Sequence, residues 1–325
     1  MGIAYALPYI PPAPPASPWR GISLSWRGWD GSEWDLTRPA SGLFLRPGIR
    51  GLGLPTFDRQ SSSSPAVAGS RHRGTSTGDR DVFWPLYLYS DESSAEFMKR
   101  DRAFWNSLDT DLEGTWTAHL PNSERRTLGL KLIGADDDLT HDPVQRGWAK
   151  YGINLLADHP YWMGEKVAKS WAQGDMRNYY ITAEDRITYG YPDEAIHYLS
   201  PGGALGSATF TNDGDVPAYP VWTAIGPTTA VSFGVGGSDI IVPFEIPEGY
   251  AVQMDTDPVD GQVLWYGQWD AATKSLLTPL DRTTDLSPAS AFVAIPRGQD
   301  RPLTIQMTGT GTVIAEVQNR YRRAT

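Results

Sequence analysis

The sequence contains no cysteine, which excludes disulfide bonds, thiolate catalysis and cysteine-ligated metal. It also lacks an apolar run near the roughly 20 residues needed to cross a bilayer, so we expect no membrane insertion. An excess of basic residues is missing too. The formal net charge is −10, whereas a protein that grips a phosphate backbone uses clustered Lys and Arg. We therefore expect no specific nucleic-acid binding.

Motifs for chemistry are also absent. The five histidines have no H-x-x-x-H or H-x-H spacing that would indicate a zinc site; they are at positions 72, 119, 141, 159 and 197. Asp136, Asp137 and Asp138 follow Gly134, and we interpret them as a solvated turn, since three consecutive carboxylates point in different directions. A glycosidase carboxylate pair needs no fixed spacing, so the sequence leaves it open without naming a residue. We expect no enzyme, no cofactor and no metal.

Length and composition predict two mainly β domains. At 325 residues the chain exceeds the roughly 250–300 residues at which a single core stops growing. The 33 Gly and 26 Pro are typical of many short strands joined by turns. Composition and periodicity lapse near residue 170. We therefore predict an arm (1–18), a first domain (19–165), a linker (166–177) and a second domain (178–325).

The N-terminal arm is rich in proline. Residues 1–17 lack the basic start and apolar centre of a signal peptide, and prolines at positions 8, 11, 12, 14 and 15 stiffen the segment into an extended form. Such an arm either docks on a surface or leads into the fold without structure.

The first domain opens with a predicted β-hairpin. Residues 22–26 and 33–36 alternate polar and apolar side chains around Asp30-Gly31, a dipeptide that tolerates the positive φ of a tight turn. A strand containing Leu43 and Leu45 follows, and the glycines at 48, 51 and 53 mark positions where the chain bends.

Residues 58–81 form the main irregularity of this domain. The segment is small and polar, has no period of 2 or 3.6, and is predicted to be a long loop. Its Arg71, His72 and Arg73 either contact a neighbouring subunit or are solvated. The aromatic strand 82–89 follows, and Pro85 indicates an edge or a bulge, because proline cannot donate a ladder hydrogen bond.

A single helix and three more strands complete the first domain. Ser93 and Glu96 form a capping box, and one broad face of the helix carries apolar side chains at Ala95, Phe97, Met98, Trp105 and Leu108. Segments 115–120, 126–134 and 147–157 alternate as half-buried strands.

The second domain is predicted to be a β-sandwich or jelly roll. Short strands follow one another from about Asn178, with turn signals every 8–12 residues or so. Asn212 and Gly214 suit a turn, and Pro220 starts a strand in which Val221, Thr223 and Ile225 share one face. Trp265 to Trp269 is predicted to be a hairpin, and the last two strands, LTIQMTG and TVIAEVQNRY, are predicted to pair.

These patterns resemble a known family. The opening hairpin, the glycine turn region, the polar segment closed by a hydrophobic strand, and the ending around Pro160 and Trp162 resemble the N-terminal domain of siphophage distal tail proteins. Residues 208–226 are similar to the C-terminal galectin-like sandwich of the same family. The resemblance implies an N-terminal β-sandwich-like ring domain with one packed α-helix, followed by a galectin-like or jelly-roll β-sandwich.

The resemblance also implies a function. It predicts a structural virion protein at the distal end of a long non-contractile phage tail, made in the host cytoplasm, which forms a homo-hexameric ring and acts as a hub. The implied partners are the tail tube (major tail) protein, the tape measure protein and other minor tail proteins, with DNA passing through a neutral to acidic lumen. The expected subunit contacts are Arg71, His72, Arg73, Trp84 and Tyr87.

A second reading comes from the aromatic residues of the second domain. Trp265, Tyr266 and Trp269 would allow stacking on sugar rings, as in a carbohydrate-binding β-sandwich module. Aromatic side chains on a hairpin also serve as edge plugs or subunit contacts, and we favour the structural reading.

Overall fold

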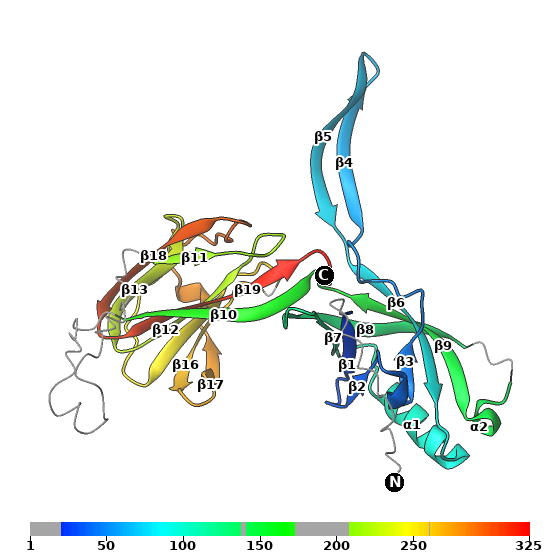
Figure 1. Ribbon diagram of the computed structural model, residues 1–325. Coiled ribbons are helices and arrows are strands. Elements are labelled where there is room, and N and C mark those ends of the chain that lie inside the picture. Colours follow the sequence, from blue (N-terminus) through cyan, green and yellow to red (C-terminus); the bar gives the residue numbers. More distant parts are fainter. Residues whose placement is uncertain (1–20, 138–140, 173–207, 260) are drawn as a thin grey trace, which may run out of the picture.

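The computed structural model describes residues 21–137, 141–172, 208–259 and 261–325 (Figure 1). The predictions for the N-terminal arm (1–18), for residues 178–207, for Asp138 and for His197 lie outside these residues. The chain is mainly β and builds two sandwiches, which we call the first unit and the second unit. In the described ranges no helix is both long and apolar enough to cross a membrane.

The first unit contains one long helix and most of the longer strands. Its strands are β1 (Ser23–Arg27), β2 (Glu33–Asp35), β3 (Leu43–Leu45), β4 (Phe57–Ser64), β5 (Val67–Thr77), β6 (Arg80–Tyr89), β7 (Gly114–His119), β8 (Arg125–Asp137), β9 (Trp148–Ala157) and β10 (Trp162–Ala172). Its helices are α1 (Ser94–Asn106), α2 (Pro143–Arg146) and the 3-10 turn η1 (Pro39–Ser41).

The second unit consists of strands and one 3-10 turn. The strands are β11 (Thr209–Thr211), β12 (Pro220–Ile225), β13 (Thr228–Val235), β14 (Ile240–Val242), β15 (Tyr250–Asp255), β16 (Leu264–Asp270), β17 (Ser275–Asp281), β18 (Asp300–Gly309) and β19 (Thr312–Tyr321). The 3-10 turn is η3 (Thr283–Asp285).

Two sheets pack face to face in the first unit. One contains β2, β1, β7 and β8, and the other contains β3, β6 and β9; β8 joins both, with a bulge between Leu132 and Gly134. Their inner faces hold a tryptophan cluster, in which Trp84 meets Trp26 at 5.2 Å and Trp116 at 5.4 Å between ring centroids, edge to face. All three rings are buried, so this cluster is the centre of the first core.

Several local predictions for the first unit are confirmed. β1 and β2 pair as the predicted hairpin, with Gly31 at a φ of 81° in the turn. The Ser93 side chain accepts a hydrogen bond from the Glu96 amide and caps α1. Phe97 of the predicted helix face is buried, whereas Ala95 is exposed, so it does not belong to the packed face.

Two predictions about β6 and its predecessor are wrong. Residues 58–81 are not a loop: β4 and β5 pair along their length as a hairpin. β6 is not a free edge either, because it pairs with β9 from Arg80 to Tyr89 on one side and with β3 on the other. Pro85 is tolerated inside β6 because its carbonyl accepts a hydrogen bond from the Arg46 amide. The backbone N–H that proline lacks is not needed for the pairing of the strands.

The second unit is also a two-sheet sandwich. One sheet runs β17-β16-β15-β12-β19-β10 and the other β11-β18-β13-β14. Trp222 stacks on Phe233 across the core at 5.1 Å. Val221, Thr223 and Ile225 share the opposite face of β12, as predicted. The predicted pairing of the last two strands is wrong, because β18 and β19 enter different sheets.

The predicted linker is wrong where the structure describes it. β10 continues from Trp162 to Ala172 and pairs with β19 over most of that length. Met163 at its start pairs with Thr127 of β8, so one strand passes from the first unit into the second (Figure 1). Residues 166–172 are therefore part of a paired strand and not a linker.

The last residues of the chain return to the first unit. Ala324 is buried in the first core, and its amide donates to the Leu52 carbonyl at 2.9 Å. Arg126 donates to the Arg323 carbonyl at 3.0 Å and lies over the Tyr321 ring. The predicted second domain, 178–325, therefore includes a tail that packs on the first unit.

Candidate functional site: interaction surfaces of the first unit

The β4–β5 hairpin projects from the first unit into solvent (Figure 1). Its side chains are almost all exposed, and its strands pack on each other rather than on the rest of the chain. Contacts are made at its base, where the Tyr161 hydroxyl donates to Thr77 Oγ1 at 3.1 Å and Arg322 lies over the Phe57 ring. The exposed hairpin is thus an arm anchored at one end.

The hairpin carries the predicted basic contacts. Ser61 pairs with His72 and Ser62 with Arg71, and a bulge places Arg73 so that its Nε donates to Ser62 Oγ at 3.0 Å. Arg71 and Arg73 therefore lie on one face of the ribbon and His72 on the other. All three side chains are exposed and can meet another molecule.

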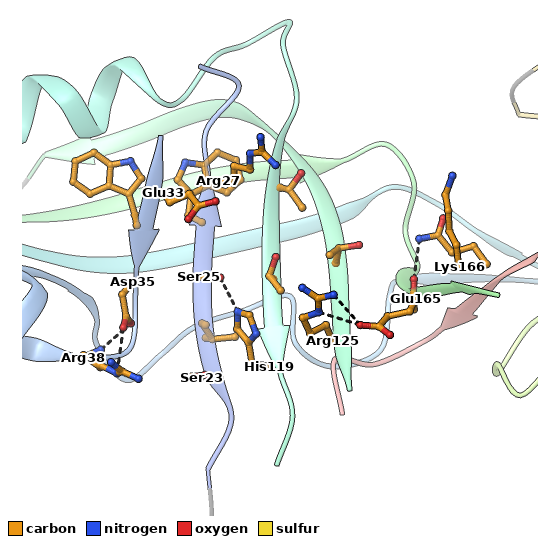
Figure 2. Close-up of a pocket in the computed structure, with 18 residues that line it drawn as sticks. Ser23, Ser25, Arg27, Glu33, Asp35, Arg38, His119, Arg125, Glu165 and Lys166 are labelled. Atoms are coloured by element: carbon orange, nitrogen blue, oxygen red, sulfur yellow. Dashed lines mark hydrogen bonds and ion pairs between the residues drawn. The ribbon is translucent and has the colours of Figure 1, made fainter. Parts of the chain in front are cut away.

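A concave polar face covers the outer side of the β2-β1-β7-β8 sheet (Figure 2). It encloses about 1150 Å³, and the same strands turn Leu24, Trp26 and Trp116 inward to the core. Strand alternation alone thus separates an apolar inner row from a polar outer row. The outward side chains are Ser23, Ser25, Arg27, Glu33, Asp35, Thr115, Thr117, His119, Arg125 and Thr127.

Short polar contacts cross this face. His119 Nε2 and Ser25 Oγ lie 2.9 Å apart on neighbouring strands, and Arg125 pairs with Glu165 at 3.0 Å (Figure 2). Both members of that ion pair are well exposed, so the pair contributes little to stability. Four cationic side chains (Arg27, Arg38, Arg125, Lys166) and three acidic ones (Glu33, Asp35, Glu165) line the face, so its charges nearly balance.

The outer side of the opposite sheet is aromatic. Phe44 of β3, Phe83, Tyr87 and Tyr89 of β6, and Trp148 of β9 are half-buried there, and we call this set the aromatic face. Trp84 is not part of it, because even-numbered residues of β6 point into the core. Trp84 is fully buried, so the predicted subunit contact there is wrong. Tyr87 is half-buried on the outer side of the sheet.

The structure does not bring the predicted sugar-stacking residues together. They lie within strand β16, which hairpins with β17, rather than forming a hairpin themselves. Trp265 is 38% exposed on the outer face, while Tyr266 points to the other side and packs against the second core. Tyr266 stacks on Tyr250 at 5.5 Å. The three rings share no common platform for a sugar.

The predicted acidic turn is a strand. Asp136 pairs with Gly152 and Asp137 with Tyr151 at the end of β8, which corrects the solvated-turn interpretation. Across the described ranges, no three His, Asp or Glu side chains come close enough together to hold a metal ion.

No local sequence pattern predicts the role of Arg80. Its side chain is 2% exposed and donates to four backbone carbonyls: Pro160 at 2.6 Å, Gly51 at 2.8 Å, Gly53 at 2.6 Å and Arg322 at 2.8 Å. Burial lowers the pKa of Arg80 to about 10, so the guanidinium is still protonated at neutral pH. It ties the returning C-terminal tail to the base of the β4–β5 hairpin.

Comparison with known proteins gives a result at the level of structure. No protein-family model matches the chain, and no curated protein matches its sequence. The Dit protein of SPP1, described as a paradigm of the hub adsorption apparatus in Gram-positive infecting phages, is similar with a TM-score of 0.59 and 13% identity. The similarity covers 93% of this chain and 99% of that one.

Two baseplate structures are similar as well. The phage P2 baseplate in its activated conformation with calcium matches with a TM-score of 0.53 at 12% identity, covering 92% of this chain and 98% of that chain. The same baseplate with strontium matches with a TM-score of 0.52 at 12% identity, covering 91% and 98%. Over more than nine-tenths of its length, the chain therefore has a Dit-like fold.

Proposed function

We propose that this protein is a structural component of a phage tail, where six copies form a ring that serves as a hub at the distal end of the tail tube. The Dit-like fold supports this assignment, since the similar structures are a hub protein and a baseplate. Tail tube, tape measure and other minor tail proteins are the proposed partners.

The projecting hairpin is the observation that carries the proposal. An isolated two-stranded hairpin is marginally stable in water, and its free edges invite pairing with other chains. β4 and β5 bury almost nothing within their own chain. A projecting hairpin of this kind gains stability from contact with a neighbouring molecule. Arg71, His72 and Arg73 are the contacts that we propose on the β4–β5 hairpin.

The polar concave face suits the wall of a channel. Its outward side chains are mostly short or charged. With nearly balanced charges it would hold a passing nucleic acid weakly, because strong retention needs an excess of cations facing the phosphates. We assign this face to the lumen and the hairpin to contacts between subunits or rings.

The test is a charge reversal on the hairpin. In the double variant Arg71→Glu/Arg73→Glu we expect an unchanged melting temperature but a loss of the assembled species in light scattering, because the exposed face of the arm no longer fits its partner. Lys274→Glu, at an exposed turn of the second unit, is the matched control and should assemble normally. Normal assembly of the hairpin variant would contradict the proposed contact.

A further inference from the structure

The β4–β5 hairpin is joined to the rest of the first unit by two short segments. Residues 51–56 lead into β4, and only Gly78 and Asp79 separate β5 from β6. A side chain at Gly53 would meet nothing within 4 Å beyond its chain neighbours, and one at Gly78 would meet only Thr56 Oγ1, at 3.9 Å. A few loop residues with this freedom are enough to absorb the backbone rotations of a moving element. By themselves, the two segments leave the direction of the hairpin open.

Residues 322–324 follow β19 and lie beside the base of the hairpin, and we call them the strap (Figure 1). Ala324 is fully buried, and its amide donates to the Leu52 carbonyl at 2.9 Å. The Arg322 guanidinium lies 5.9 Å from the centre of the Phe57 ring, at the first residue of β4. The strap therefore contacts both the segment that leads into the hairpin and the hairpin itself.

Arg80 joins the strap to the same segment. Its Nη2 donates to the Arg322 carbonyl at 2.8 Å, and its Nη1 donates to the carbonyls of Gly51 at 2.8 Å and Gly53 at 2.6 Å. Because the Arg80 side chain is 2% exposed, a carbonyl or N–H that lost its partner here would stay away from water, which is costly. These hydrogen bonds are therefore expected to form or break together.

The strap is held by the second unit as well. The Arg322 amide donates to the Asp215 carboxylate at 2.9 Å, and the Asp215 amide donates to the Arg320 carbonyl at 2.8 Å. Asp215 lies between β11 and β12. Where the two units meet, the pairing of β10 with β19 shifts register between Met163 and Lys166, and such an irregularity allows a strand to bend. A change in the angle between the units would therefore move the strap.

We propose that the strap fixes the direction of the β4–β5 hairpin and makes that direction depend on the position of the second unit. While the strap is in place, its contacts hold the base of the hairpin. When a partner moves the second unit or displaces the strap, these contacts break together and the hairpin turns on residues 51–56 and 78–79. The inference concerns a single chain and holds whether or not six copies form a ring.

The test measures the direction of the hairpin as a distance between two spin labels. The chain contains no cysteine, so Ser63→Cys on the hairpin and Thr110→Cys on the first unit, both exposed, each take one label. The labelled full-length chain is diluted with an excess of unlabelled parent, so that distances between copies do not contribute. Pulsed electron–electron resonance should give one narrow distance distribution. Ala324→Glu places a charge at a buried position, so it should release the strap and widen the distribution several-fold.

Asp215→Ala tests the link to the second unit. It removes the acceptor of the Arg322 amide but leaves the Arg80 hydrogen bonds, so it should widen the distribution by a smaller factor. Asp213→Ala, at an exposed position between the same strands, is the matched control and should change nothing.

Each variant is first checked for a cooperative melting transition, and Asp215→Ala remains informative if Ala324→Glu fails to fold. A parent distribution as wide as that of Ala324→Glu, or equal widening in Asp213→Ala, would overturn the role of the strap. A width that Asp215→Ala leaves unchanged would overturn the dependence on the second unit.

Discussion

At the scale of single residues, one buried polar side chain, Arg80, links segments that are far apart in the sequence. Arg80 is a buried cation that is held by four carbonyls, and those carbonyls come from segments distant in the sequence. Strand alternation predicts that Trp84 points inward and Tyr87 outward once the strand is known. No local pattern identifies the carbonyls that converge on Arg80, because they are assembled only by the fold.

Arg80→Lys should destabilise the protein strongly. A lysine ammonium cannot reach all four carbonyls, and each buried polar group left unpaired costs about 1–3 kcal/mol. We expect a loss of about 3 kcal/mol or more in the free energy of unfolding, measured by urea titration. Arg102→Lys, at an exposed position of α1, is the control. Equal losses of unfolding free energy in both variants would show that the four hydrogen bonds of Arg80 do not stabilise the fold.

Replacing Glu113 should stabilise the protein, in contrast to the replacement of Arg80. Burial raises the pKa of its carboxyl, although the nearby Lys131 opposes this. The folded state therefore binds the proton more tightly than the unfolded chain. Above the folded pKa, the ionised carboxylate lowers the free energy of unfolding, and this loss of stability disappears as the pH falls.

Glu113→Gln removes that penalty. We expect a higher melting temperature than the parent at pH 7, and a difference that vanishes below the ordinary glutamate pKa of 4.5. Glu92→Gln, at an exposed site before α1, should show no such pH-dependent gain. A gain that persists unchanged at low pH would assign the effect to packing rather than to charge.

At the scale of elements, local signals were reliable and distant pairings were not. Turn residues and alternation predict the β1–β2 hairpin and β9, and the capping box predicts α1. The β4–β5 hairpin was not predicted, because its Ser, Gly and Thr residues have no hydrophobic period. Such a period is absent since neither face of the hairpin is buried. The full length of β10 was not predicted for another reason: its partner strand, β19, lies far away in the sequence.

The cap of α1 gives a direct element-level prediction. Ser93→Ala removes the acceptor for the Glu96 amide and should lower the free energy of unfolding by about 1 kcal/mol. Chemical denaturation measures this, and Ser70→Ala on the exposed hairpin is the control. An effect no larger than the control would show that the helix end is held by other contacts.

At the scale of the whole molecule, composition and length indicated a mainly β chain, while the order of the two sandwiches followed from the family resemblance. The shared strand β10 and the tail at Ala324, which returns to the first core, were not predicted, because nothing local marks a segment that crosses between units. These two connections couple the units, and the hairpin is left free to reach a partner.

The proposed ring contains six copies of the chain. A cyclic contact joins two different faces of each subunit, so assembly should stop at one size instead of growing without limit. Native mass spectrometry of the purified full-length protein over a wide concentration range tests this most directly. We predict a discrete species with six times the mass of one chain. A monomer that persists at the highest concentration would show that the protein does not form the ring by itself and would refute the proposal.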